Sequence, residues 1–322
     1  MRQLILPTLP LVAVACTNDY GVTVDGGITG VMNPRPLEVT QQTDRLIQTV
    51  PPEVDVLWVV DDSCSMFDDQ AAVSKHFPIF FEFFEGSGLD YHLGVVTTDM
   101  ISSTRRGKLV TAKGYRWIDV DTPQAASVFE DFMPGTGGQF PEQGIDATFY
   151  GLEVEKNEFN LGFLRERSSV HIILISDEQD YSEHGNELVT PEELSAFLNG
   201  LRQDGDQVTF SSIALPNSKY FTVSGFVGGI THPILEGEWG TVLERLGVQA
   251  AGLKREYFLS QLPVPGTIDV AVKENETTYR FTEGEDWEYN PIRNSISFHV
   301  YVPNPMAEVL ITYDILSSDH GD

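Results

Sequence analysis

Between residues 50 and 262, short apolar runs alternate with segments whose apolar residues recur every three or four positions. The short runs are typical of strands that are buried on both faces, as in a parallel sheet. The longer spacing predicts amphipathic helices between these strands. The pattern therefore predicts a doubly wound, mainly parallel, Rossmann-like α/β sheet. The expected strands are Val56–Val60, Tyr91–Thr98, Val170–Ser176 and Val208–Leu215, and the expected helices are Met66–Phe84, Gly144–Leu161, a helix beginning at Thr190, and Glu238–Ala251.

Two local signals refine these helices. Thr190-Pro191-Glu192-Glu193 places a threonine at the N-cap, a proline at the first helical position and a glutamate at the third, which predicts a helix start. Pro78 falls inside the first expected helix, where a proline removes a backbone hydrogen bond and should kink or restart the helix.

From about residue 262 the pattern changes to strict alternation of apolar and polar residues. Alternation with proline and asparagine turns, and without a helix signal, predicts a small antiparallel β domain over residues 263–322. Residues 17–50 carry few clustered apolar side chains and predict a linker. The expected organisation is a leader at 1–16, the linker, an α/β domain at 51–262 and the β domain.

The N-terminus has the composition of a secretory signal peptide. Its apolar run, Leu4–Ala15, is too short to span a bilayer as a helix. The run ends in Ala13-Val14-Ala15-Cys16, which resembles the bacterial lipobox and implies that Cys16 is lipidated after cleavage. The lipobox prefers leucine where Ala13 stands, so plain cleavage and an uncleaved segment are alternatives. Thr17 stands where aspartate retains such proteins in the inner membrane, which implies an outer-membrane anchor on the cell envelope, with a periplasmic or secreted protein as the alternative.

Charge and cysteine content limit the possible partners. The chain has 20 lysines and arginines against 48 aspartates and glutamates, a net charge of −28. Such a surface repels nucleic-acid phosphates and bare anionic lipid, and it suits divalent cations. The two cysteines, Cys16 and Cys64, are too few for a disulfide framework.

The candidate chemistry lies directly after the first strand, in Asp61-Asp62-Ser63-Cys64-Ser65. Open α/β sheets place ligands at the carboxyl ends of their strands. One carboxylate and two hydroxyls are hard oxygen donors, suited to Mg²⁺, Mn²⁺ or Ca²⁺. A second strand, Val170–Ser176, also ends in an aspartate, Asp177. The alternative is local: Ser65 caps the following helix, while Asp61 and Ser63 make turn hydrogen bonds.

A buried strand, Asp61-x-Ser63-x-Ser65, an amphipathic helix and a later strand ending in Asp177 together resemble the von Willebrand factor A family. The resemblance covers roughly residues 50–262 and implies that family's metal-ion-dependent adhesion site. It implies that Ser63 and Ser65 coordinate the cation directly, while Asp61 and Asp177 act through water or at the rim. The β domain looks, more loosely, like a module found behind A-type domains in bacterial surface lipoproteins.

The family supplies one further ligand, a threonine on the loop before the third main helix, and here the pattern departs. The position nearest that helix is Glu142, whereas Thr136 lies further back on the loop. We therefore expect Glu142 as the ligand, with Thr136 as the alternative. A glutamate neutralises one more charge of the cation than a threonine does. It should tighten metal binding and weaken the pull on an acidic partner.

The resemblance implies a non-enzymatic adhesion module that binds a protein or glycan through an acidic group at the metal. Two other functions stay open: an envelope protein whose metal only stiffens the loops, and a hydrolase acting through Asp61 or Cys64. The phosphatase pattern needs an arginine six residues after the cysteine, and Gln70 stands there. The sequence contains no His-Glu-x-x-His, Gly-x-Ser-x-Gly or phosphate-loop motif.

Overall fold

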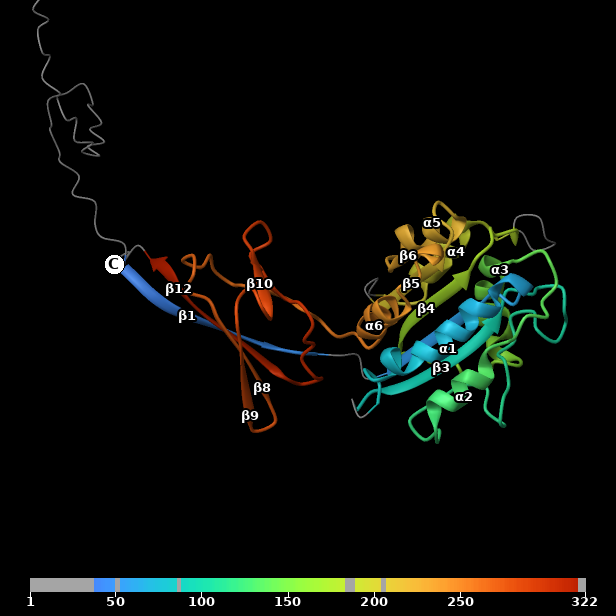
Figure 1. Ribbon diagram of the computed structural model, residues 1–322, viewed down its shortest axis with the longest axis horizontal. Helices are drawn as coiled ribbons and strands as arrows, with labels where there is room; N and C mark the ends of the chain where they lie inside the picture. The colour runs from blue at the N-terminus through green and yellow to red at the C-terminus, as the bar shows by residue number, and fades with distance from the viewer. Residues whose placement is uncertain (1–37, 50–52, 86–87, 183–188, 204–206, 318–322) are drawn as a thin grey trace, which may run out of the picture. The chain divides into compact units, whose positions relative to one another are not determined.

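A five-stranded parallel sheet lies at the centre of the α/β part of the chain (Figure 1). The computed structural model describes residues 38–49, 53–85, 88–182, 189–203 and 207–317. The strands stand in the order β3-β2-β4-β5-β6. Their bounds are β2 Glu53–Val60, β3 Asp90–Thr97, β4 Ser169–Ser176, β5 Val208–Ala214 and β6 Thr231–Pro233.

The order of these strands defines where a ligand site is expected. A short segment at Ile118 bridges Leu93 of β3 in the antiparallel sense, outside the named strands. If the Ile118 segment is counted as the third strand along the chain, next to β3, the order across the sheet is third, second, first, fourth, fifth and sixth. This is the doubly wound order. The direction of winding reverses between β2 and β4. The structure thus confirms the predicted fold class and puts the switch point at the two strands that end in Asp61 and Asp177.

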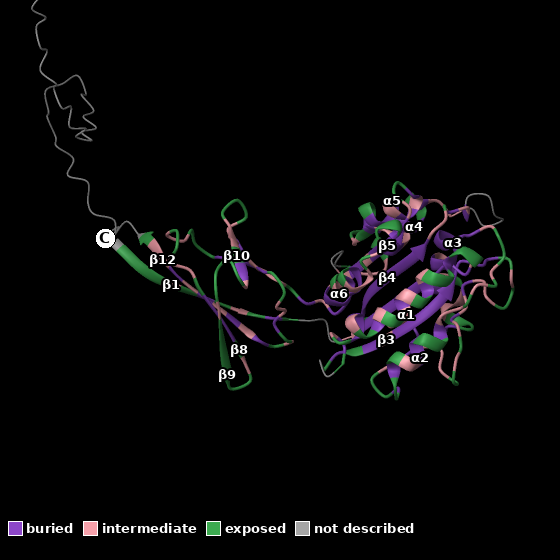
Figure 2. Ribbon diagram, in the orientation of Figure 1, coloured by how far each residue is buried: buried purple, intermediate pink, exposed green. Residues whose placement is uncertain are grey.

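Helices cover both faces of the sheet. One buried apolar cluster joins α1, α2 and α6 to one face around Trp58, and a second joins α3, α4 and α5 to the other face around Leu57. Figure 2 shows the sheet as the most continuously buried layer, because its strands are covered on both sides. The helices are α1 Phe67–Phe81, α2 Ala125–Phe132, α3 Gly144–Phe149, α4 Pro191–Gly200, α5 Lys219–Val227 and α6 Trp239–Ala250.

The helix boundaries agree with the local sequence signals, with two differences. The Thr190 hydroxyl accepts a hydrogen bond from the Glu193 amide, and the Glu193 carboxylate accepts one from the Thr190 amide, so the predicted capping box is present. Pro78 does not break α1, which continues to Phe81. The expected helix 144–161 is shorter, because α3 passes into a π turn at Tyr150–Val154 and a 3₁₀ turn that ends at Asn157.

The remaining strands form two antiparallel sheets, as the alternating pattern predicted. One has the order β1-β12-β8-β9 and the other β10-β11-β7. Their bounds are β1 Glu38–Ile47, β7 Glu256–Phe258, β8 Asp269–Glu274, β9 Thr277–Phe281, β10 Trp287–Asn290, β11 Ser295–Phe298 and β12 Glu308–Ser317.

Strand β1 changes the expected organisation of the chain. Residues 38–47 were predicted as part of a linker, and instead they pair with β12 at the far end of the sequence. Likewise β7 pairs with β11, so the antiparallel part begins before residue 262. Asp44 of β1 explains the pairing: it accepts hydrogen bonds from the Ser260 amide (2.7 Å) and the Tyr313 hydroxyl (2.8 Å). The α/β part is thus inserted between two strands of the β part.

His171 of β4 is a buried histidine whose titration should appear in the stability of the fold. Its ring nitrogens lie 2.7 Å from the Thr209 hydroxyl and 3.2 Å from the Ser169 hydroxyl, and burial lowers its pKa to about 4. The unfolded chain therefore binds a proton between about pH 6.5 and 4 that the folded chain rejects. Stability should fall as the pH falls through this window.

We expect His171→Gln to remove up to about 1.4 kcal/mol per pH unit from that slope. Urea unfolding at several pH values between 7 and 4, followed by circular dichroism at 222 nm, measures it. The helices that dominate this signal all lie in the α/β part. The same slope in wild type and variant would contradict the assignment.

The leader and Cys16 lie outside the described residues, so their predicted cleavage and lipidation stay predictions. Within the described part of the chain, no helix is long and apolar enough to cross a membrane.

Candidate metal centre

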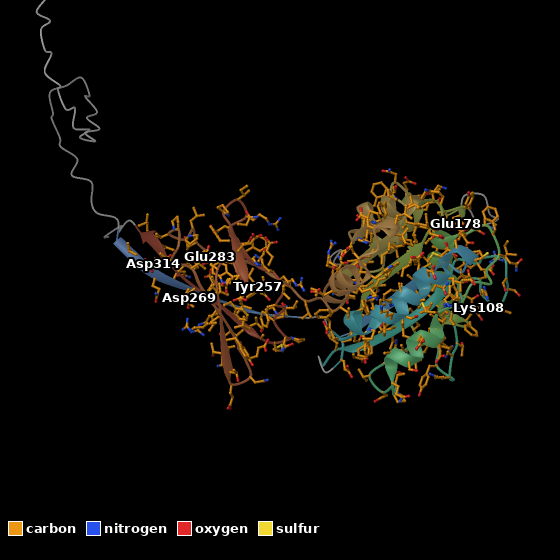
Figure 3. All side chains as sticks on the ribbon, in the orientation of Figure 1. Lys108, Glu178, Tyr257, Asp269, Glu283 and Asp314 are labelled. Carbon is orange, nitrogen blue, oxygen red and sulfur yellow. The ribbon has the colours of Figure 1, made fainter. Side chains whose placement is uncertain are left out.

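The carboxyl ends of β2, β3 and β4 bring the candidate residues to one edge of the sheet. Val60 is in register with Thr97 on one side and with Ile175 on the other. The Asp61 amide continues this pairing by donating to the Ile175 carbonyl (3.0 Å), and the Thr98 amide donates to the Val60 carbonyl (3.2 Å). The loops after these strands therefore begin side by side. Figure 3 labels Glu178 at this edge, two residues beyond β4.

Three of the predicted ligands are in direct contact. The Ser63 and Ser65 hydroxyl oxygens lie 3.0 Å apart, and the Ser65 hydroxyl donates to the Asp177 carboxylate over 3.1 Å. Ser65 and Asp177 are 112 residues apart in the sequence, so only the fold joins them. Ser63 and Asp177 are half-buried and Ser65 is exposed, which leaves the group open to solvent.

The spacing of these oxygens fits a hard divalent cation. Two adjacent oxygens that each lie about 2.1 Å from an octahedral Mg²⁺ are about 3.0 Å apart, and the larger, often seven-coordinate shell of Ca²⁺ brings neighbouring oxygens to a similar separation. The separations of 3.0 Å and 3.1 Å therefore fit either ion. They also fit hydrogen bonds, so the side chains already hold one another in place. Within the described residues, no cluster of three or more His, Cys, Asp or Glu side chains could hold a metal. The hydroxyls are therefore essential to any site here.

Asp61 is buried beneath this group and holds the loop in shape. Its carboxylate accepts hydrogen bonds from the Ser63 amide (2.8 Å) and the Ser176 hydroxyl (2.6 Å), so both oxygens are engaged. Burial raises the pKa of Asp61; the bonds from Ser176 and Ser63 lower it in part, and the nearby Asp177 raises it again. These contacts suit the indirect role that the motif implied for Asp61. Ser65, by contrast, makes no side-chain capping bond to the helix that follows.

The segment at Glu142 crosses the same edge of the sheet. On one side the Gln143 amide donates to the Thr98 carbonyl (3.1 Å), and on the other the Tyr181 amide donates to the Glu142 carbonyl (2.8 Å). Thr98 follows β3 and Tyr181 lies beyond β4, so this segment passes over the end of β2, which lies between those strands. Glu142 is thereby placed above the loop that contains the serines.

The surroundings of the Glu142 side chain favour a cation. It is buried, and its carboxylate accepts a hydrogen bond from the Thr98 hydroxyl (2.5 Å). Burial raises the pKa of Glu142 to about 8; the Thr98 bond lowers it, while the charges of Asp61, Asp62 and Glu178 raise it further. A divalent cation among these carboxylates would favour the ionised form of Glu142. The burial of the Glu142 carboxylate close to three other carboxylates is the feature beyond the motif itself that fits a metal.

The alternative ligand, Thr136, lies on the loop that covers Asp61 from another side. The side-chain amide of Gln70 joins the two segments, because it donates to the backbone carbonyls of Asp61 (2.8 Å) and Gly135 (3.0 Å). Thr136 itself is half-buried, and within the described residues its side chain makes no hydrogen bond. Both candidates for the third-loop ligand are therefore close to the site. Of the two, Glu142 is the one whose side chain lies near the other carboxylates of the site.

Several residues that support the site were not predicted from the sequence. Ser176 and Thr98 orient two of the carboxylates, and Arg105 pairs with the buried Asp62. Burial raises the pKa of Asp62 to about 6, Arg105 lowers it, and Asp99 and Asp61 raise it. Of these residues, Ser176 could have been found from the sequence, because it is the polar residue that ends an apolar strand. The others depend on contacts between distant loops.

Two further polar residues lie next to the predicted ligands in the sequence, Cys64 and Asp180. Cys64 is a free, exposed thiol between the two serines. Asp180, three residues beyond Asp177, is buried and accepts hydrogen bonds from the Ile145 amide (3.1 Å) and the Ser182 hydroxyl (2.9 Å). Asp180 therefore holds the start of α3.

Replacing Glu142 by threonine should weaken Mg²⁺ binding by about tenfold, because a buried negative charge beside the cation is lost. Isothermal titration calorimetry measures the affinity. Glu142→Gln keeps the size of the side chain and should show the same loss, whereas Thr136→Val should bind Mg²⁺ as wild type does. If the affinity falls for Thr136→Val and not for Glu142→Thr, the assignment of Glu142 is wrong.

Comparison with protein-family models and with curated proteins gives no match. Similar solved structures include a von Willebrand factor type A protein from Catenulispora acidiphila, with 11% identity and a TM-score of 0.40 over 90% of this chain and 68% of that one. Proximal thread matrix protein 1 of the mussel byssus has 13% identity and a TM-score of 0.38, over 67% of this chain and 51% of its own. The pilus adhesin SpaC of Lactobacillus rhamnosus GG, in its open conformation, has 11% identity and a TM-score of 0.42, over 90% and 44%. The chain thus covers about half of the last two proteins.

Proposed function

We propose that residues 53–250, which form the doubly wound α/β part of the chain, are a von Willebrand factor A-type, non-enzymatic module that binds a protein or glycan through a divalent cation. The hydrogen bond of 3.1 Å from Ser65 to Asp177 carries this proposal, because it brings the two halves of the motif together at the switch point of the sheet. The same contact would be unnecessary for a serine that only capped a helix.

In this proposal each residue of the site has a distinct role. Ser63 and Ser65 hold the cation through their hydroxyl oxygens, and their protons point to acceptors such as Asp177. Asp61 keeps the loop in shape through Ser63 and Ser176, and Glu142 adds a negative charge once the cation favours its ionised form. When bound, the cation supplies an open position for an oxygen of the partner.

The place of action in this proposal is the cell envelope. A lipid on Cys16 would anchor the chain in the membrane, with the outer membrane favoured. The net charge of −28 suits a protein that meets its partner through a cation and does not meet nucleic acid.

Removal of the metal tests the function. We expect Mg²⁺ at one hundred times its dissociation constant to stabilise the α/β part by about 2.7 kcal/mol over the EDTA state. A pull-down from envelope extract, with Mg²⁺ and with EDTA, should lose its partner in EDTA. Stabilisation by Mg²⁺ with the same partners in EDTA would favour the purely structural alternative. Turnover of generic ester or phosphate substrates would favour the hydrolase, and no response to any divalent cation would contradict the proposal.

A further inference from the structure

Two large aromatic side chains are exposed on the loops around the candidate metal centre. Phe67, the first residue of α1, is 68% exposed, and Phe140, on the loop before α3, is 65% exposed. The Phe140 ring packs edge-to-face on Tyr181, with 5.1 Å between centroids. Because burying apolar surface is favourable, these two exposed rings offer binding energy that the folded chain does not use.

These aromatic groups belong to the same edge as the site. Phe67 follows Ser65 by two residues, and Tyr181 follows Asp177 by four. Ser65 and Asp177 are hydrogen-bonded to each other, and the Tyr181 amide donates to the Glu142 carbonyl. The aromatic side chains thus come from the loops that form the candidate centre, one at the start of α1 and the others beyond β4 and before α3.

Uncompensated carboxylates accompany the aromatic rings. Asp68 is exposed, and Asp69 and Glu178 are half-buried. Asp177 acts on both Asp69 and Glu178 as a neighbouring like charge. Within the described part of the chain, no lysine, arginine or histidine forms an ion pair with Asp68, Asp69 or Glu178. Arg105 is at this edge, and it is already paired with the buried Asp62.

We propose that this acidic–aromatic rim, formed by Phe67, Asp68, Asp69, Phe140, Glu178 and Tyr181, docks a basic, apolar segment of a partner protein beside the cation. It deepens the proposed function, because it rests on the carboxyl edge being the binding face. Charge complementarity selects the partner: apolar side chains cover Phe67 and Phe140, and lysine or arginine side chains compensate the unpaired carboxylates. A neutral or acidic glycan supplies no such charge.

The probe is a phage-displayed library of short random peptides, selected on the full chain at physiological salt, once in EDTA and once in Mg²⁺. We expect the enriched peptides to carry net positive charge and aromatic or large aliphatic residues in both selections. Affinities of the synthesised peptides are then measured by calorimetry. We expect Phe67→Ser/Phe140→Ser and Asp68→Asn/Glu178→Gln each to weaken binding by about tenfold or more, as for side chains at the centre of an interface.

A matched control is available on another face of the sheet. Phe226 of α5 is 55% exposed, and Phe226→Ser should leave the affinity within about twofold. Three results would overturn the inference: enrichment of acidic peptides, a loss of affinity in Phe226→Ser equal to that in the rim variants, or peptide binding that survives both rim variants. Rim-dependent binding to a glycan array, with no peptide enriched, would also overturn it. If peptides bind in EDTA and the chain does not respond to divalent cations, the proposed metal function is wrong and the proposed peptide-docking rim is still supported.

Discussion

Replacing Ser63 and Ser65 together with alanine is expected to weaken Mg²⁺ binding by about a hundredfold or more and to remove the stabilisation by Mg²⁺. Two of the three oxygens that lie 3.0–3.1 Å apart would be lost, and Asp177 alone cannot replace them. Calorimetry measures the affinity, and thermal unfolding followed at 222 nm measures the stabilisation. In EDTA the variant should unfold close to the wild-type temperature, because both hydroxyls are at the surface.

The chain offers a closely matched control on the neighbouring loop. Ser102 and Thr104 form a second pair of hydroxyls two residues apart, with 2.9 Å between their oxygens, after β3. Ser102→Ala/Thr104→Ala removes a comparable pair of hydroxyls. Within the described residues no aspartate is hydrogen-bonded to these hydroxyls, since Asp99 accepts from the Ser102 backbone amide instead (2.9 Å), and the variant should bind Mg²⁺ as wild type does. Equal losses in the two double variants would mean that the cation has no preference for the Ser63 loop. Retention of Mg²⁺ binding by Ser63→Ala/Ser65→Ala would remove the site altogether.

The second large effect is expected at the opposite end of the sheet, where Arg165→Met should destabilise the α/β part by about 3–5 kcal/mol. Asp55 of β2 is fully buried, and it accepts hydrogen bonds from the Arg165 amide (2.7 Å), the Arg165 Nε (2.8 Å) and the Ser168 hydroxyl (2.5 Å). The same guanidinium donates to the carbonyls of Val54 (3.0 Å) and Asp90 (3.1 Å). Methionine would keep the packing of the stem and leave the buried carboxylate with one charged partner fewer.

The pKa of Asp55 sets how this variant should depend on pH. Burial raises that pKa, and the bonds and charge of Arg165, with the Ser168 bond, lower it in part. Without Arg165 the pKa rises further, so the variant should recover stability as the pH falls and Asp55 takes up a proton. Urea unfolding at pH 7 and at pH 5 gives the comparison.

Two further variants check the reason for this loss. Arg280→Met removes an exposed ion pair with Asp269 in the β part and should cost less than about 1 kcal/mol. Asp55→Asn/Arg165→Met removes both charges and should recover a large part of the stability, because no buried charge stays unpaired. A single Arg165→Met variant as stable as wild type would show that Asp55 finds another partner.

Local patterns predicted most of the α/β fold. The apolar runs at Val56–Val60 and Val170–Ser176 predicted strands of a sheet covered on both faces, and they are β2 and β4. The capping box at Thr190 predicted the start of α4 to the residue. The motif after β2 and the aspartate after β4 also predicted a shared site. The physical reason is that parallel strands present their carboxyl ends at one edge.

The sequence by itself determined the elements, their faces and the chemistry of the Asp61–Ser65 loop, because those depend on spacing over a few residues. The tertiary structure alone decided that β1 crosses from an expected linker to pair with β12, since Asp44 finds its partners more than two hundred residues away. It also decided where Glu142 lies, because the Glu142 carbonyl accepts from the Tyr181 amide and the neighbouring Gln143 amide donates to the Thr98 carbonyl. Such contacts join segments that are far apart in the sequence, and no local pattern indicates that they meet. They form because backbone groups and charges that are buried on folding need hydrogen-bond or ionic partners.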